Sequence, residues 1–330
     1  MNGDESPRMV IAGASGLIGR RLVAAAKSHW NVTVLTRTVD GSEPAGVTAV
    51  AWNPRAARDG DEEALNALAG VLDGADVLVN LAGASIADGR FGAEHRRRIL
   101  DSRIDATSTL VEAAKRTERA PATWLQASAS GLYGDRGDEV LDEASPPADD
   151  FLAQVGVAWE AAAAPAAERS RLVIGRIGVV FAPEAKAWQQ LLLPIRLFAG
   201  GPLGSGRQWW PWVHADDLVR AMLFLVGTRK ADAANGDTQA EGAYVLTAPE
   251  PARQIDIARA AARELRRPVW LPVPDFALRI VLGGLADYLL LPSTRAVPKR
   301  LLDAGFTFRY PTIDEAAAGL ISGVSAPTPR

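Results

Sequence analysis

The hydrophobic residues of the chain fall into short continuous runs that alternate with amphipathic stretches. The runs lie at 8–14 (RMVIAGA), 31–37 (NVTVLTR), 47–52 (VTAVAW), 75–83 (ADVLVNLAG), 122–130 (ATWLQASAS) and 171–181 (RLVIGRIGVVF). Stretches with helical periodicity lie between them, at 16–28, 61–74 and 103–117. Alternating strands and helices predict βαβ units, and continuous apolar runs are typical of parallel strands buried on both faces. The sequence therefore predicts an α/β fold, a Rossmann-type doubly wound parallel sheet.

The alternation fades after residue 181. Segments 187–199 and 252–265 have helical patterns, and the glycine- and tryptophan-rich segment 200–218 leads into a helix at 218–226. Residues 229–242 predict an exposed loop, and the tail 325–330 (SAPTPR) predicts disorder. We expect a dinucleotide-binding domain at 1–181, to which 213–248 returns through the strand 243–248. Residues 182–212 and 249–330 would form a smaller C-terminal substrate lobe that closes over the cofactor.

Composition excludes several classes of protein. The 330 residues include no cysteine, which rules out disulfides, thiolate nucleophiles and cysteine-ligated zinc, and no His/Asp/Glu spacing predicts a metal site. The net charge of −3, without a dense basic stripe, predicts no nucleic-acid partner. The start lacks a signal-peptide pattern, and the apolar segment 280–292 is short and interrupted by Asp287. We expect a soluble cytoplasmic protein, monomeric or homodimeric, with a small-molecule substrate and no membrane partner.

The strongest chemical signal is the glycine motif GASGLIG, directly after the first predicted strand. Gly13, Gly16 and Gly19 have the spacing G-x-x-G-x-x-G at the point where a strand gives way to a helix. Such glycines let the backbone turn tightly beside a pyrophosphate, and the helix N-terminus supplies N–H donors. We therefore predict a dinucleotide site built from Gly13, Ser15, Gly16, Leu17, Ile18 and Gly19.

Two further segments refine the predicted cofactor. The second strand ends in Arg37, where an acidic residue would hold the 2′-hydroxyl of NAD, whereas an arginine suits the 2′-phosphate of NADP. NADP(H) is therefore favoured over NAD(H), although an ordinary surface arginine at a strand end is the alternative. The fourth strand ends in small residues that let a cofactor lie against the sheet, namely Asn80, Leu81, Ala82 and Gly83.

These residues resemble the extended short-chain dehydrogenase/reductase superfamily. The segments YGDRGDE (133–139), WVHADD (212–217) and AGFTFRYPT (304–312) are similar to an epimerase-family branch that is often described as SulA-like or as sugar-nucleotide epimerases. The resemblance runs from Met9 to about Ile321. It implies a cofactor-binding domain, a substrate lobe and, in most members, a catalytic Tyr-x-x-x-Lys pair with a serine and an asparagine.

The catalytic pair is missing from this chain. None of the four tyrosines is followed four residues later by lysine. Alignment of the motifs by eye places Leu152 at the tyrosine position and Gly156 at the lysine position. Ala129 takes the serine position between Ser128 and Ser130, either of which becomes the serine if the alignment shifts by one residue. Arg103 takes the asparagine position, so the family's mechanism does not carry over directly.

Four residues remain as catalytic candidates: Tyr133, Arg103, Ser130 and Ser128. Tyr133 follows the fifth strand at the carboxyl edge of the sheet, where it either reaches the nicotinamide or packs in the loop. Arg103, which we also place in the cofactor site, either stabilises a developing oxyanion electrostatically or bridges to a carboxylate such as Glu160.

The predicted substrate pocket draws on three regions: Ser85; Tyr133 and Asp135; and Trp210, Trp212 and His214. The loop from Asp135 to Glu139 either orients a substrate or folds on itself. His214 is either an acid/base group or the end of a strand that is followed by a helix cap at Asp216, and we favour the structural role. The tryptophans either line a pocket or anchor the core, although alternation along a strand directs one of Trp209, Trp210 and Trp212 away from the core.

Three functions are open. The first is an NADP(H)-dependent oxidoreductase or isomerase with an atypical acid/base set, acting on an activated group such as an iminium or a conjugated carbonyl. The second is a catalytically silent protein that senses NADP(H). The third is a nucleotide-sugar epimerase with a substituted acid and base, which requires a phosphate-binding set for which Arg207, Arg295 and Lys299 are the candidates.

Overall fold

Seven parallel strands form the central sheet of the computed structural model, which describes residues 6–41, 44–88, 91–227 and 240–323. Their order is β11-β7-β5-β4-β1-β2-β3. The strands are β1 (Arg8–Ala12), β2 (Asn31–Thr36), β3 (Val47–Ala51), β4 (Val77–Asn80), β5 (Thr123–Ala129), β7 (Arg171–Ile177) and β11 (Gly242–Leu246). All six predicted runs enter this sheet, and β11 lies at its edge beside β7. The predicted loop 229–242 lies largely outside the described residues, and the tail 325–330 lies entirely outside them.

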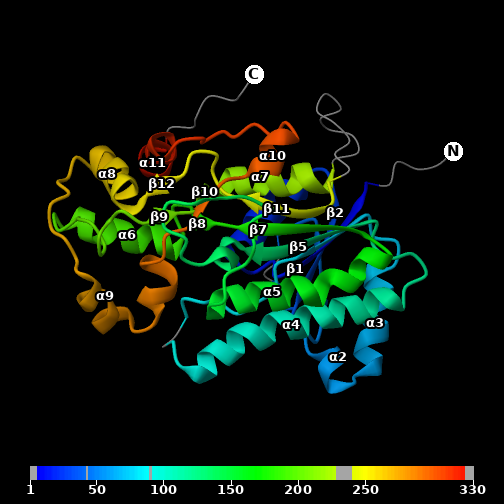
Figure 1. Ribbon diagram of the computed structural model, residues 1–330. Coiled ribbons are helices and arrows are strands. Elements are labelled where there is room, and N and C mark those ends of the chain that lie inside the picture. Colours follow the sequence, from blue (N-terminus) through cyan, green and yellow to red (C-terminus); the bar gives the residue numbers. More distant parts are fainter. Residues whose placement is uncertain (1–5, 42–43, 89–90, 228–239, 324–330) are drawn as a thin grey trace.

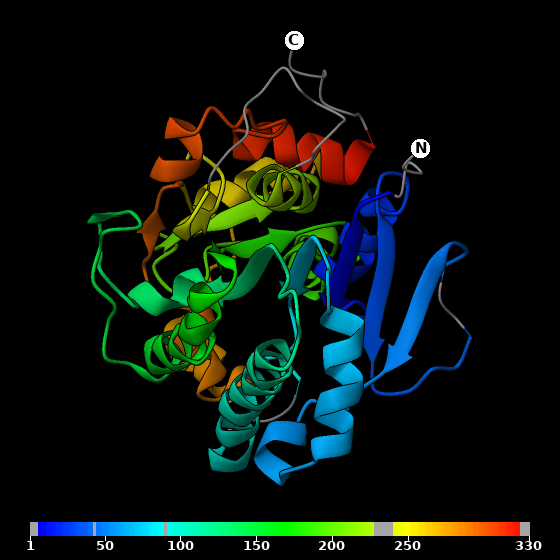
Figure 2. The same ribbon diagram turned by 90° about the vertical axis from the view of Figure 1, so that its right-hand side faces the viewer.

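Helices cover both faces of the sheet, which confirms the doubly wound fold (Figures 1 and 2). On one face lie α1 (Leu17–Ala26) and α7 (Ala215–Val226); on the other lie α3 (Glu62–Leu72), α4 (Ala93–Lys115) and α5 (Phe151–Ala163), with the short α2 (Ala56–Asp59) and η2 (Ala164–Glu168) beside α4. All four residues of β4 are buried because the sheet is covered on both sides. Asp150 begins α5 by accepting hydrogen bonds from the N–H groups of Leu152 and Ala153.

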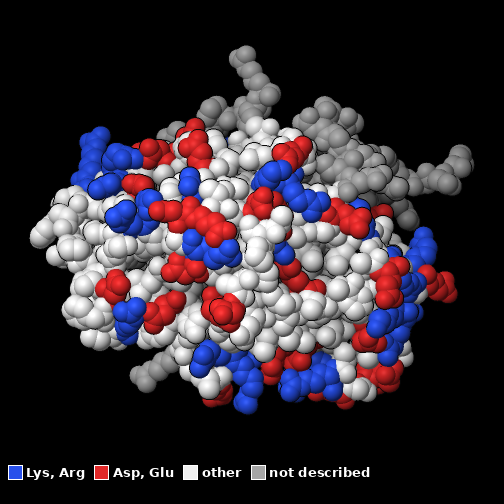
Figure 3. Space-filling view, in the orientation of Figure 1, with Lys and Arg blue, Asp and Glu red and all other residues white. Residues whose placement is uncertain are grey.

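A second lobe extends from the carboxyl edge of the sheet, on the left of Figure 1. It contains β8 (Val179–Phe181), α6 (Lys186–Arg196), β9 (Trp209–Trp210), β10 (Trp212–His214), β12 (Ala252–Arg253), α8 (Gln254–Leu265), α9 (Asp275–Leu282), the π-helical turn η3 (Ala286–Leu290) and α11 (Ile313–Ser322). Its core forms around Phe181, Trp188 and Trp212. The surface over α6 and α9 carries few charged side chains in Figure 3, where acidic and basic side chains are interspersed over other parts of this face.

The remaining C-terminal elements lie against the main domain. They are α10 (Lys299–Asp303) and β13 (Arg295–Ala296), which pairs with β6 (Val140–Leu141). In the main domain, the 3₁₀ turn η1 (Ser130–Tyr133) follows β5. Leu301, Phe306 and Phe308 belong to the predicted substrate lobe, yet they pack into the core of the main domain. The substrate lobe is therefore more interleaved with the sheet than the sequence segments alone indicate.

The topology creates a crevice at the carboxyl edge of the sheet. The chain leaves β1 toward β2 and β3, and it then returns to the other side of β1 as β4. In open α/β sheets, ligands bind at such a switch point because the connections diverge there. The glycine motif follows β1, Arg37 follows β2, and residues 81–83 follow β4, so the fold brings these three predicted segments to one edge.

Candidate functional site

The glycine loop is packed so tightly that two of its three glycines are required by the chain itself. Gly13 has φ of +84°, and a Cβ there would lie 2.7 Å from the backbone of Leu81. A Cβ on Gly19 would lie 2.3 Å from the carbonyl oxygen of Gly13. A Cβ on Gly16 would lie 3.4 Å from that same oxygen, which is ordinary contact. Nothing in the described part of the chain therefore requires glycine at position 16, which is the position where the pyrophosphate of a ligand would approach.

The N-terminus of α1 is open toward this loop. Gly16 is the N-cap residue and supplies no side-chain cap, and the first turn holds no acidic residue. The Gly16 N–H closes the turn on the carbonyl of Gly13, and the first helical bond runs from Arg20 to Gly16. The free N–H groups and the helix dipole therefore favour an anion here. The arrangement fits the pyrophosphate of a dinucleotide.

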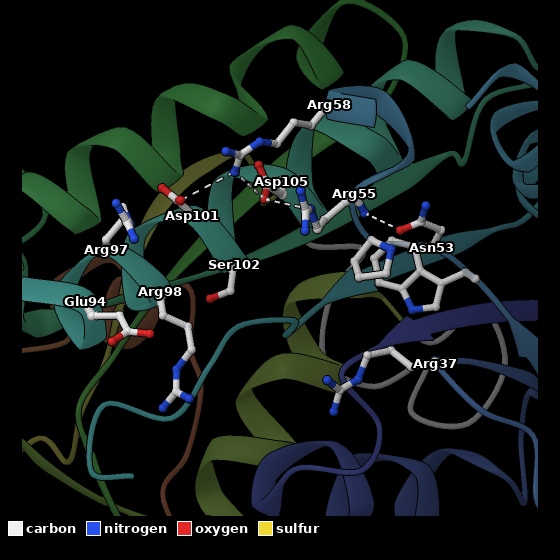
Figure 4. A pocket seen from close by; sticks show the side chains of 12 residues that line it. Arg37, Asn53, Arg55, Arg58, Glu94, Arg97, Arg98, Asp101, Ser102 and Asp105 are labelled. Carbon is white, nitrogen blue, oxygen red and sulfur yellow. Dashed lines mark hydrogen bonds and ion pairs between the residues drawn. The ribbon is translucent and has the colours of Figure 1, made fainter. Parts of the chain in front are cut away.

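A basic pocket of about 840 Å³ lies at the same edge, beyond β2 and β3 (Figure 4). Arg37 and Arg98 lie on opposite sides of it, with Asn53 on the side of Arg37 and Ser102 on the side of Arg98. Arg55 and Arg58 are paired with acidic residues of α2 and α4. No such partner engages Arg37 within the described part of the chain. Arg37 is exposed, so its guanidinium is free to meet an anionic group.

The segment after β4 is fixed by the side chain of Asn80. This residue is fully buried and donates to Thr107 Oγ1 and Gln126 Oε1, both at 3.0 Å. Its Oδ1 accepts the N–H of Ala82 at 3.1 Å, and the N–H of Leu81 bonds to the carbonyl of Ala12. Asn80 thus holds the loop against the glycine turn. Its role in the predicted cofactor site is to shape the backbone.

Arg103 lies beneath this loop without a carboxylate. Its Nη1 donates to the carbonyls of Ala84 at 3.0 Å and Ile99 at 2.9 Å, and its guanidinium lies 4.8 Å from the ring centre of Trp159. A Cβ on Gly83 would lie 3.2 Å from the guanidinium carbon. Burial lowers the pKa of Arg103 to about 10, so the side chain stays charged at neutral pH. The structure therefore places a partly buried cation directly against the loop that follows β4.

The carboxylate of Glu160 has another partner. Arg176 binds it through two hydrogen bonds of 2.9 Å, and Ser128 Oγ donates to it at 2.6 Å. Arg176 also donates to the hydroxyl of Tyr133 at 3.0 Å. The bridge from Arg103 to Glu160, one of the two alternatives for Arg103, is thus wrong. The sequence signal for this network was Arg176, a charged residue inside the apolar run 171–181, because a buried arginine requires a partner.

Tyr133 is fully buried, and it belongs to a small cluster with Leu132, Leu141, Val245 and Ala296. Burial raises the pKa of Tyr133 to about 12. A hydroxyl in this state gives up its proton less readily than a free tyrosine. This placement corresponds to the packing alternative, and the catalytic role of Tyr133 stays a prediction.

Apolar side chains occupy the positions of the missing pair. Leu152 is buried and lies beside Gly131. A Cβ added to Gly131 would lie 3.7 Å from the Cβ of Leu152. A Cβ on Gly156 would lie 3.2 Å from Cβ of Leu132. A lysine at position 156 would therefore have to displace Leu132. The packing of α5 against η1 therefore leaves no room for a lysine side chain at position 156 unless Leu132 moves.

The predicted pocket residues of the second lobe are also buried. Trp210 and Trp212 lie in its core, and their indole N–H groups donate to the carbonyls of Leu290 and Glu250. Trp209 is the tryptophan that faces outward, between the guanidinium groups of Arg253 and Arg295. One member of the tryptophan run therefore points away from the core, as alternation along a strand requires.

Of the other predicted site residues, Asp135 and Ser85 lie in loops and Ser130 is buried. Asp135 Oδ1 accepts the N–H groups of Gly137 and Ser293, which fixes the loop between them. Ser85 is exposed and lies near Asp88, whose carboxylate bonds to Lys186 of α6 at 2.7 Å. Ser130 is buried at the start of η1. The structure brings the predicted cofactor residues together, but within the described part of the chain the predicted substrate residues lie in several separate places and do not line one pocket.

His214 is buried and caps α7, so the cap predicted at Asp216 is wrong, and Asp216 lies in the first turn of the helix. Its Nδ1 accepts the N–H of Asp216 at 3.1 Å, and its ring lies 3.9 Å from that of Tyr310. Burial lowers the pKa of His214 below its usual value. The geometry is that of the structural role favoured for this residue.

The free energy of unfolding should therefore decrease as the pH drops below about 6.5, which is the pKa of a histidine in the unfolded chain. The unfolded state takes up the proton first, since the folded-state pKa is lowered, and the stability present above that pH is lost as pH falls toward the folded value. Thermal unfolding at several pH values measures this. His214→Asn keeps a capping side chain without the titration and should flatten the profile. An unchanged profile in His214→Asn would contradict this role.

The candidate phosphate residues do not form one set. Arg207 and Arg295 lie near Trp209, where the carbonyl of Arg207 is bonded to Arg253. Lys299 pairs with Asp303 within α10. Within the described ranges, no group of three or more His, Cys, Asp or Glu residues is arranged to hold a metal ion. No helix of this part of the chain has the length and apolar character that crossing a membrane requires.

Comparison with known proteins places this site in a family. Residues 9–239 match the NAD dependent epimerase/dehydratase family, and residues 273–320 match a domain of unknown function, DUF1731. The chain is 35% identical over 312 residues to an epimerase family protein of Mycobacterium leprae, covering 93% of this chain and 94% of the relative. It is 34% identical over 315 residues to the chloroplastic SDR39U1 homolog, an epimerase family protein of Arabidopsis thaliana, covering 94% and 86%.

Among solved structures, the human epimerase family protein SDR39U1 (isoform 2) with NADPH aligns with a TM-score of 0.81 at 26% identity, covering 96% of this chain and all of that one. The fold and the glycine loop define an NAD(P)-binding protein of the short-chain dehydrogenase/reductase type. More narrowly, the chain belongs to the NAD dependent epimerase/dehydratase family, with SDR39U1-like proteins among its relatives. The resemblance inferred from the sequence is thereby confirmed.

Proposed function

We propose that this protein is an NADP(H)-binding oxidoreductase or isomerase that works without the Tyr-x-x-x-Lys pair. The observation that carries the proposal is that the parts of the site lie at one edge of the sheet. The uncapped N-terminus of α1 meets a loop that only glycine fits at positions 13 and 19, and the basic pocket around Arg37 lies at the end of the neighbouring strand β2. When bound there, the cofactor would supply or accept hydride.

The preference for NADP(H) rests on Arg37. Ala12 pairs with Leu35 in the sheet, so Arg37 lies close to the glycine loop that follows Ala12. Its exposed guanidinium has no carboxylate partner among the described residues, and the same pocket also holds Arg97 and Arg98. A 2′-phosphate would find charge-assisted donors here. The human relative that was solved with NADPH supports the same choice.

Arg37→Gln should weaken NADPH binding by about tenfold to a hundredfold, because one charge-assisted contact contributes about 1.5–3 kcal/mol. NADH has no 2′-phosphate, so its affinity should change by less than about twofold. Calorimetric titration of both nucleotides measures the two effects. Arg259→Gln, which alters a side chain that is 60% exposed on α8, is the matched control. Equal losses for NADPH and NADH in Arg37→Gln would count against the assignment.

The chemistry proposed for this site is electrostatic. Leu152 stands at the position aligned with the tyrosine, Leu132 packs against Gly156 at the position aligned with the lysine, and the hydroxyl of Tyr133 is bonded to Arg176. Arg103 contacts the loop that follows β4 at Gly83, and its cation suits a substrate on which negative charge develops. Such a substrate is an activated carbonyl or iminium compound, which requires less proton transfer than a sugar hydroxyl. Oxidation of NADPH in the presence of a panel of such compounds tests this chemistry.

A catalytically silent NADP(H)-responsive protein is the second candidate. The burial of Tyr133 and the apolar packing at Gly156 favour it, because both remove the usual proton donors from the site. It predicts tight NADPH binding without turnover of any compound in the panel. A nucleotide-sugar epimerase is the weaker alternative, since Lys299 is paired within its own helix and lies apart from Arg207 and Arg295.

A further inference from the structure

Within the described residues, the charge of Arg103 has no carboxylate partner. Its guanidinium contacts two backbone carbonyls and the face of Trp159, and none of these groups is anionic. Glu160, the carboxylate that follows Trp159 on α5, is already bound by Arg176. The neighbouring acids of α4, Asp101 and Asp105, are paired with Arg58 at the far side of that helix. In this part of the chain, a positive charge therefore remains uncompensated between the loop that follows β4 and α5.

The position of this charge relative to the cofactor follows from the topology. The adenosine half belongs to the β2 side of the switch point, where Arg37 and the basic pocket lie. The other half of a dinucleotide extends across β1 toward β4 and β5. Arg103 lies on that second side, because it contacts Gly83 after β4 and Trp159 of α5. Its charge is thus closest to the nicotinamide half.

We propose that Arg103 makes this site selective for the redox state of the cofactor, so that NADPH binds much more tightly than NADP⁺. This inference rests on the proposed function. The two forms share the adenosine, the 2′-phosphate and the pyrophosphate, and they differ in the ring, which is neutral when reduced and cationic when oxidised. A cation in a poorly solvated position repels the oxidised ring and leaves the reduced ring unaffected.

The selectivity has a consequence for either candidate function. A protein that binds the reduced form preferentially is occupied according to the ratio of NADPH to NADP⁺. In a reductase, the preference promotes release of the spent cofactor after each turnover. In a silent protein, it makes the bound fraction a measure of the reducing state of the pool.

Calorimetric titration of the full-length protein with NADPH and, separately, with NADP⁺ tests the inference. We expect NADPH to bind the wild type at least about tenfold more tightly. Arg103→Gln removes the charge but keeps N–H donors for the two carbonyls, and it should bring the two affinities within about threefold. Arg103→Lys keeps the charge and should retain the preference. Arg37→Gln is the matched control: it should weaken both forms equally and leave their ratio unchanged.

Two results would overturn the inference. One is equal affinity of the wild type for the two forms, which needs no variant at all. The other is an unchanged preference in Arg103→Gln when its melting temperature shows that it is folded. Absence of binding by both forms would instead overturn the proposed function, so the two failures are distinguishable.

Discussion

Replacing Glu160 by leucine should lower the free energy of unfolding by about 3–5 kcal/mol, the usual cost of removing one partner of a buried ion pair. The side chains of Glu160 and Arg176 are only 15% and 12% exposed. Without the carboxylate, Arg176 keeps its charge inside the protein, and Ser128 Oγ loses its acceptor. Urea unfolding of the wild type and the variant measures the difference.

Glu112→Leu is the matched control for this change. Glu112 pairs with Lys115 on α4, but its side chain is 38% exposed, and such surface pairs contribute about 0–1 kcal/mol. If Glu160→Leu is no more destabilising than Glu112→Leu, the network of Arg176 does not hold β5, β7 and α5 together as the hydrogen bonds indicate.

Replacing Gly16 by alanine should weaken NADPH binding by about a hundredfold while leaving the fold intact. The residue has φ of −72°, which alanine adopts readily, and the added Cβ would meet only the carbonyl of Gly13 at 3.4 Å. The methyl group would instead stand where the pyrophosphate approaches the N-terminus of α1. Calorimetry gives the affinity, and thermal unfolding shows that the variant is folded.

Gly19→Ala provides the contrast. Its Cβ would lie 2.3 Å from the carbonyl oxygen of Gly13, so this variant should lose stability even without cofactor. The two substitutions thus separate a glycine required by packing from a glycine required by a ligand. Full NADPH affinity in Gly16→Ala would mean that no ligand approaches the loop at this point.

The sheet and the cofactor loop were predictable because their signals are local. Each strand is one continuous apolar run, and the turn after β1 needs glycine at 13 for its positive φ and at 19 for close packing, so both requirements appear in neighbouring positions. The structural role of His214 was predicted from the start of a helix in the segment HADDL, but the cap was expected at Asp216, because aspartate is a preferred N-cap residue and histidine is not.

Side-chain direction and pairing were not predictable in the same way. The sequence puts Tyr133 after β5, but only the packing of η1 against β7 and β11 shows that its hydroxyl faces Arg176. Spacing could not show that Glu160 binds Arg176 and Ser128 and not Arg103, because these residues lie on different segments of the chain. The pocket around Arg37 likewise draws on the segment after β3 and on α2 and α4, which local patterns do not connect.

Titration of the purified protein with NADPH, and in parallel with NADH, is the most direct test of the account. If the glycine loop and Arg37 form a working site, NADPH binds with one-to-one stoichiometry and at least about tenfold more tightly than NADH. Absence of NADPH binding would contradict the central claim, because the loop, the open helix N-terminus and the basic pocket would then be features of the fold alone.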